Sequence, residues 1–136
     1  MKKVLLIALV GAAVAAAPAT AASPTVRMTI LHVVSGCHVW ADQAFRELGA
    51  QTTITVKRGT KLEIRPNCPM TFEFRQRKGP KLRLGDPLTR PGTSRTIVFA
   101  RRGVYVLTVR NLETPEQVGL QTLGPTNVLK LTVRVK

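Results

Sequence analysis

The two cysteines of the chain, Cys37 and Cys68, are its side chains best suited to covalent or metal chemistry. In an exported protein, two cysteines usually form one disulfide. Thiolates also bind soft metal ions, whereas buried free thiols pack as small apolar side chains. The sequence favours a Cys37–Cys68 disulfide, and a metal site or two free thiols remain as alternatives. Closing the loop between them would contribute roughly 3 to 4 kcal/mol to stability.

Residues 1–21 have the pattern of a cleavable export signal. Two lysines follow the first Met, the run Val4–Ala17 is apolar and uncharged, and Pro18 then breaks any helix. A small-x-small cleavage pattern ends at Ala21. A membrane span needs about 20 apolar residues, so a retained anchor is the less favoured alternative, and no later segment could span a membrane. We expect a secreted, periplasmic or cell-envelope protein with one mature domain, residues 22–136.

The protein is strongly basic, with 21 Lys and Arg against 7 Asp and Glu, and a formal net charge of +14. The charge is densest in the middle of the chain, where the candidate polyanion-binding residues are Arg75, Arg77, Lys78, Lys81 and Arg83. Such a charge favours anionic lipid headgroups or envelope polymers, and a merely solvated surface is the alternative. Nucleic acid is not an expected partner, because the chain is exported and has few aromatic side chains on which bases could stack.

No catalytic motif is recognisable in the chain. Ser35, Cys37, His38 and Asp42 are close in sequence, but a nucleophile needs a base that is positioned in space. There is no nucleophile elbow, phosphate-binding loop or metalloprotease helix, and the 7 acids form no paired-carboxylate pattern. We therefore expect a non-catalytic protein.

Short stretches with strand-like alternation recur along the mature chain, separated by Gly, Pro and Asn. In the final stretch, apolar residues from Leu129 to Val135 alternate with polar ones, which is typical of a sheet with one face in water. A short helical turn is expected at Ala41–Leu48. The expected strands cover residues 26–34, 52–56, 61–65, 72–75, 96–100, 104–109 and 128–135.

These strands predict an all-β fold, a Greek-key antiparallel β-sandwich of about seven or eight strands. Trp40 is expected to be an anchor of its core. His32 lies within the first strand, and we expect it to be a satisfied core or surface histidine rather than a metal ligand.

Three segments resemble the cupredoxins, the family of plastocyanin. Residues 54–64 look like the family's unit of strand, Gly turn and strand. Asn67-Cys68-Pro69-Met70 stands where that unit is followed by an Asn and a Pro-His pair. Gly103–Val109 is similar to the Gly-x-Tyr strand that runs into the family's ligand cysteine. The resemblance covers roughly residues 26–136 and implies a cupredoxin-like sandwich.

The resemblance also implies that the usual blue-copper site is lost. In the family, two His, one Cys and usually a weak Met hold the copper. Here the position of the first His falls on Met70 and that of the cysteine on Val109, and no Cys, His or Met follows Val109. The expected function is thus an exported binding or structural module without a cofactor, at an anionic envelope.

Copper binding remains the alternative function. In cupredoxins the loop after the first strand and the turn after the Asn both lie at the metal end of the sandwich. This placement would bring Cys37 and His38 near Cys68 and Met70. Either the disulfide closes that end, or these four residues form a soft-ligand site suited to Cu(I).

Overall fold

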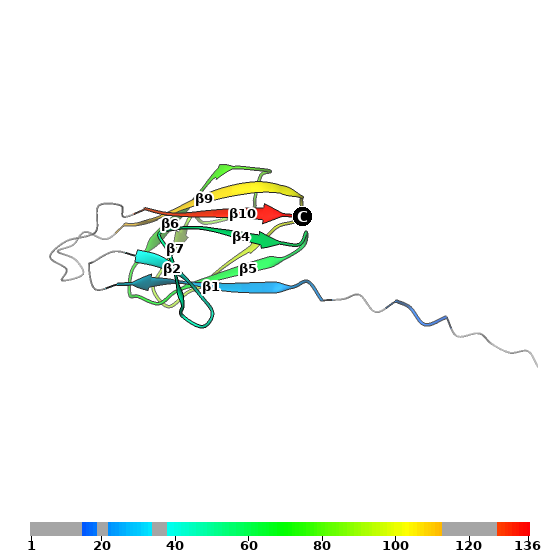
Figure 1. Cartoon of the computed structure of the whole chain (residues 1–136), viewed down its shortest axis with the longest axis horizontal. Coiled ribbons are helices and arrows are strands. Elements are labelled where there is room, and N and C mark those ends of the chain that lie inside the picture. The colour runs from blue at the N-terminus through cyan, green and yellow to red at the C-terminus, as the bar shows by residue number, and fades with distance from the viewer. Residues whose placement is uncertain (1–14, 19–21, 34–37, 113–127) are drawn as a thin grey trace, which may run out of the picture.

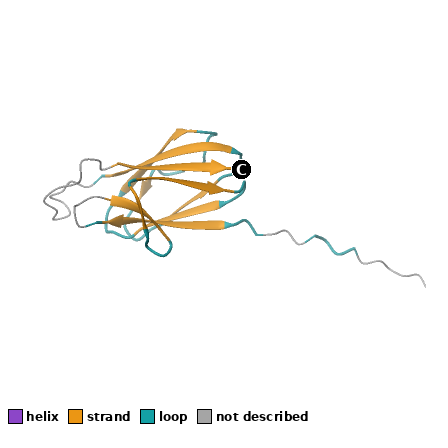
Figure 2. Ribbon diagram, viewed as in Figure 1, coloured by secondary structure: helices purple, strands orange, loops and turns teal. Residues whose placement is uncertain are grey.

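The computed structural model describes residues 15–18, 22–33, 38–112 and 128–136. These residues form ten strands and no helix (Figures 1 and 2). No helix among them could cross a membrane, and the expected export signal lies largely outside the described residues. The strands are β1 (Thr25–His32), β2 (His38–Asp42), β3 (Glu47–Gly49), β4 (Gln51–Val56), β5 (Lys61–Pro66), β6 (Phe72–Lys78), β7 (Leu88–Thr89), β8 (Arg95–Val98), β9 (Gly103–Asn111) and β10 (Val128–Val135).

The strands form two sheets of five that face each other as a sandwich. One sheet has the order β3-β2-β1-β5-β8, and the other has the order β4-β10-β9-β6-β7. The chain changes sheet between β3 and β4, β4 and β5, β5 and β6, β7 and β8, and β8 and β9. This crossing between sheets is the Greek-key connectivity that the sequence predicts, and the all-β class is confirmed.

The core lies between the sheets and follows the expected alternation. In β10, Leu129, Leu131, Val133 and Val135 are buried, whereas the residues between them are exposed or half-buried. Trp40 is fully buried, as expected, and its Nε1 donates to the carbonyl oxygen of Lys130 at 3.1 Å. Because β2 and β10 belong to different sheets, this hydrogen bond ties the two layers together.

The sheets are mixed rather than purely antiparallel. β1 runs parallel to β5, and β4 runs parallel to β10. The other pairings are antiparallel, including β9 with β10 and β6 with β9. β2, β3 and β7 were not expected as strands, because they are short and lack a long alternating pattern. β3 and β7 are edge strands that pair with β2 and β6, whereas β2 lies between β1 and β3.

The helical turn expected at Ala41–Leu48 is wrong. Ala41 pairs with Thr29 of β1 as part of β2, and β3 then follows from Glu47. Between the two strands, the Asp42 carboxylate accepts from the backbone N–H groups of Ala44 at 2.9 Å and Arg46 at 3.0 Å. Burial of β2 against the core and this Asp42-centred turn override the weak helical pattern.

Candidate functional site

Four chain segments meet at the end of the sandwich where β1 finishes. β1 ends at His32, β2 begins at His38, and these two residues are opposite each other in the antiparallel pair. The turn that follows β5 lies beside them, because the Asn67 N–H donates to the carbonyl of Ile30 at 2.9 Å. The end of β9 joins the same group, since the Leu112 N–H donates to the carbonyl of Thr71 at 3.0 Å. The four segments thus carry their side chains into one small region.

Two imidazoles, a thioether and an amide form the centre of this region. His38 Nε2 lies 3.2 Å from Met70 Sδ, and Asn111 Nδ2 donates to the same sulfur at 3.3 Å. The His32 and His38 rings are stacked with centroids 5.2 Å apart, and the edge of His38 meets Phe72 at 5.2 Å. His38, Met70 and Asn111 are all buried. We call His32, His38, Met70 and Asn111 the His–Met cluster.

His32 presents the one unusual atom of this cluster. Its Nε2 is buried and has no hydrogen-bond partner within the described part of the chain. An imidazole nitrogen in such a place costs free energy, because it has lost its contact with water without replacement. Within the described residues, His32 Nε2 thus lacks the partner that a satisfied histidine would have.

The donor types and spacing of the cluster suit a soft metal ion. Two donors bound to one ion at about 2.0 Å for nitrogen and about 2.3 Å for sulfur are roughly 3 to 3.5 Å apart. The 3.2 Å between His38 Nε2 and Met70 Sδ falls in this interval. Among the described residues, no three His, Cys, Asp or Glu side chains lie close enough to hold a metal ion. A metal site in this cluster would therefore need the Met70 thioether as one of its ligands.

The cupredoxin resemblance predicts that other residues replace the usual blue-copper ligands, and the structure describes what stands at two of these positions. Val109, at the cysteine position, is a buried apolar side chain of β9 opposite Phe74 and Leu129. Met70, at the position of the first His, belongs instead to the His–Met cluster. The ligands that the family takes from the last loop have no counterpart, since no Cys, His or Met follows Val109 in the sequence.

The two cysteines are placed only in part. Cys37 lies outside the described residues, although it directly precedes the first residue of β2. Cys68 is half-buried against the core, and its carbonyl accepts from the Met70 N–H at 2.9 Å. Cys68 thus lies at the same end of the sandwich as His38 and Met70, as the resemblance implies, and the disulfide stays a prediction.

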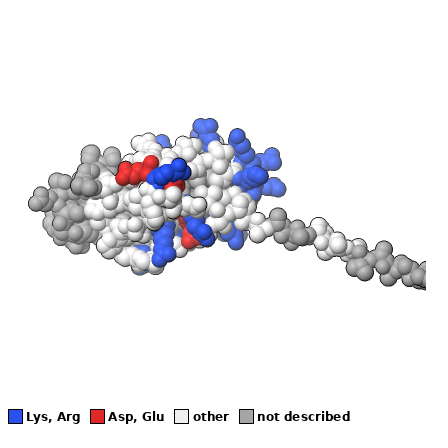
Figure 3. Space-filling view, turned by 60° about the horizontal axis from the view of Figure 1, so that its bottom comes forward, with Lys and Arg blue, Asp and Glu red and all other residues white. Residues whose placement is uncertain are grey.

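The five basic residues expected to bind polyanions do not form one uniform surface. Arg75 is paired with Glu73 at 2.7 Å, which lowers the pKa of that carboxyl, and Arg77 Nε donates to Thr108. Lys78, Lys81 and Arg83 are exposed. Figure 3 shows a gathering of Lys and Arg at the end of the sandwich from which the N-terminal residues lead away.

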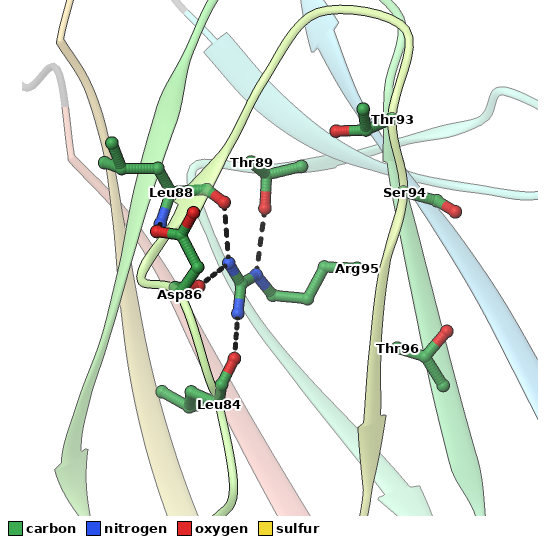
Figure 4. A pocket seen from close by; sticks show the side chains of 8 residues that line it. All are labelled: Leu84, Asp86, Leu88, Thr89, Thr93, Ser94, Arg95 and Thr96. Carbon is green, nitrogen blue, oxygen red and sulfur yellow. Dashed lines mark hydrogen bonds between the residues drawn. The ribbon is translucent and has the colours of Figure 1, made fainter.

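A cavity of about 240 Å³ beside Arg95 is the other polar site of the fold (Figure 4). Arg95 donates to Thr89 Oγ1 and to the carbonyl oxygens of Leu84, Asp86 and Leu88. Its guanidinium also lies over the Phe74 ring, with Cζ 4.7 Å from the centroid. Burial lowers the pKa of Arg95. Because these contacts occupy the guanidinium, the cavity is a structural feature rather than an anion site.

Comparisons with family models and with curated proteins give no match. Among solved structures, a multicopper oxidase from Pseudomonas thermotolerans is 13% identical, with a TM-score of 0.47, over 86% of this chain and 30% of that one. An oxidized amicyanin mutant is 10% identical, with a TM-score of 0.36, over 86% and 87% of the two chains. A cysteine protease inhibitor from Entamoeba histolytica is 9% identical, with a TM-score of 0.44, over 86% and 100%. These likenesses concern the fold, and the sandwich itself is defined by the strand order and pairing given above.

Sequence reasoning missed His32 and Asn111 as members of the cluster. The nearness of His32 to His38 could have been inferred from the sequence. A hairpin that joins residues 26–34 to a following strand places the two histidines opposite each other. Asn111 is the last residue of β9, and only the pairing of β9 with β6 brings it to Met70.

Proposed function

We propose that this chain is an exported, non-catalytic protein of cupredoxin-like architecture that binds one copper ion as Cu(I) at His32, His38 and Met70. The observation that carries the proposal is the buried, unpartnered Nε2 of His32. It belongs to a ring that stacks on His38, whose own Nε2 is already beside the Met70 sulfur. A metal ion would give the His32 nitrogen the partner that it lacks.

The donor set favours Cu(I) over harder or more highly charged ions. A thioether and two imidazoles are soft or intermediate donors, and all three are neutral. A buried site to which the described residues bring no carboxylate would leave the ion's charge uncompensated, so a monovalent ion costs less to bury than a divalent one. The acids placed by the described ion pairs, Asp42, Glu63, Glu73 and Asp86, bind arginines rather than this cluster.

The protein's own residues would hold and shield the ion. His38 is fixed by the edge contact with Phe72 and by stacking on His32, so its ring needs little reordering. Asn111 Nδ2 orients the Met70 thioether. A disulfide between Cys37 and Cys68 would close the same end of the sandwich and leave the imidazoles and the thioether as the donors.

Cu(I) titration against a competing chromogenic chelator tests this function. The wild-type protein should take up one equivalent, and Met70→Leu should weaken binding by about 10- to 100-fold, because Leu has a similar shape but no donor. Met28→Leu is the matched control, since Met28 is also buried but belongs to the general core. Equal affinity of both variants, or no uptake by the wild type, contradicts the proposal. Loss of copper on Cys68→Ser with Met70→Leu unchanged would assign the site to the thiolates instead.

A further inference from the structure

The end of the sandwich opposite the His–Met cluster carries a continuous group of cations. The turn after β4, the start of β5, the turn before β9 and the end of β10 all meet there. Backbone hydrogen bonds join them, from Arg58 N–H to the Lys136 carbonyl at 2.9 Å and from Gly59 N–H to the Phe99 carbonyl at 2.7 Å. The exposed cations of these segments, which we call the basic end, are Lys57, Arg58, Lys61, Arg101, Arg102 and Lys136.

The charge of the basic end is not neutralised. None of its six cations takes part in an ion pair within the described part of the chain, whereas Arg27, Arg46, Arg75, Arg90 and Arg110 all do. Figure 3 shows Lys and Arg gathered at this end without Asp or Glu among them on the visible face. Such a concentration of unpaired charge raises a positive potential that attracts an extended anionic partner.

The form of the basic end fits a surface better than a small ligand. Two cavities among the described residues, one beside Arg95 and one lined by β4 and β10, are lined by none of its six cations. Its cations come from turns and strand ends whose backbones are joined by hydrogen bonds. Exposed charges on neighbouring segments can contact several anionic headgroups at once.

The path of the chain indicates which anionic surface this is. The Lys61 N–H donates to the Pro24 carbonyl at 2.9 Å, so the chain enters β1 at the basic end. The residues that join the domain to the expected export signal therefore leave from this end, so a chain still attached to that signal would hold this end nearest the membrane. We propose that the basic end docks the protein on an anionic phospholipid surface, with the His–Met cluster held at the far end, away from the lipid.

Vesicle binding with two charge-matched variants tests the proposal. The first carries Lys57→Gln, Arg58→Gln and Arg101→Gln. The control carries Arg65→Gln, Arg83→Gln and Lys130→Gln, which are exposed cations outside the basic end. Both lose the same net charge, and neither touches the His–Met cluster, so both should keep the wild-type unfolding midpoint.

The wild type should bind vesicles of phosphatidylglycerol and phosphatidylcholine at low salt, but not vesicles of phosphatidylcholine alone. Each cation near an anionic surface contributes about fivefold in affinity. The basic-end variant should therefore bind on the order of 100-fold more weakly than wild type, and the control by less than about tenfold. Equal weakening of both variants overturns the proposal, as does equal binding to both vesicle types. Binding to an anionic wall polymer without binding to the anionic vesicles also overturns it.

Discussion

Arg95 and His32 differ in how the fold treats a polar side chain that it draws inward. Arg95 has 8% of its surface exposed, and its guanidinium donates to four acceptors and lies over Phe74. His32 has a buried Nε2 that meets no acceptor or donor within the described residues. The protein itself supplies hydrogen-bond acceptors for the Arg95 guanidinium, whereas its described residues supply no partner for His32 Nε2.

This difference separates a structural polar group from a binding one. Burial of a guanidinium is tolerated when every hydrogen bond lost to water is replaced, and such a group then fixes the loop that surrounds it. For a buried nitrogen without a partner, no hydrogen bond within the protein offsets the free energy lost on leaving water. Its retention beside a second imidazole and a thioether is accounted for if the missing partner is an ion.

Replacing Arg95 should produce the largest effect on stability. Arg95→Leu would leave the Thr89 hydroxyl and three carbonyl oxygens without their donor, and we expect a loss of about 3 to 5 kcal/mol in the free energy of unfolding. Denaturant unfolding measures it. Arg90→Gln is the control, since Arg90 is an exposed partner of Asp86, and it should cost no more than about 1 kcal/mol. Similar small losses for both would show that the loop does not depend on Arg95.

The oxidation state of Cys37 and Cys68 decides whether free thiolates are present at the end of the sandwich that carries the His–Met cluster. If Cys37 and Cys68 form a disulfide, Cys37→Ala and Cys68→Ala should each destabilise the protein by about 2 to 4 kcal/mol and by similar amounts. Thiol labelling followed by mass spectrometry should then find no reactive cysteine until the protein is reduced and unfolded. Two reactive thiols in the native protein would contradict the disulfide.

Replacing His32 should have little effect on stability without copper and a larger effect with it. In the apo protein, His32→Phe removes the unpartnered nitrogen while keeping a ring, so the free energy of unfolding should change by less than about 1 kcal/mol. With Cu(I) at about 100 times its dissociation constant, the wild type should gain about 2.7 kcal/mol and the variant should not. Thermal unfolding with and without Cu(I) measures both. An equal gain in the two proteins would remove His32 from the site.

The fold could be predicted from the sequence to the extent that strands alternate strongly. The long strands β1, β5, β9 and β10 were recognisable because their apolar residues recur at every second position. β7 has two residues and β3 has three exposed ones, so neither carries a periodic signal. The parallel pairing of β1 with β5 depends on crossovers between sheets, which local sequence does not specify.

The candidate site could be predicted only in part for the same reason. Met70 and His38 were grouped through the cupredoxin resemblance, and their atoms lie 3.2 Å apart. His32 was set aside because its type and strand position suggest an ordinary histidine. Whether a buried nitrogen has a partner depends on the three-dimensional surroundings, and sequence spacing does not show it.

The smallest expected effect lies at the edge of the Arg95 loop and tests how far its network extends. The Asp86 carboxylate accepts from the Leu88 N–H and from Arg90, and these bonds lower its pKa below the ordinary value of 3.8. A carboxyl whose pKa is lowered by folding stabilises the fold above its unfolded pKa, and this contribution disappears as the pH falls through the folded pKa. Wild type should therefore exceed Asp86→Asn in denaturant midpoint at neutral pH, and the difference should shrink as the pH falls below about 4. Glu47→Gln, at an exposed acid of β3 without an ion pair among the described residues, is the matched control for the loss of one carboxylate. A constant gap between wild type and Asp86→Asn across this pH range would mean that the Asp86 charge does not support the loop, and that Arg95 holds it through its backbone and hydroxyl acceptors alone.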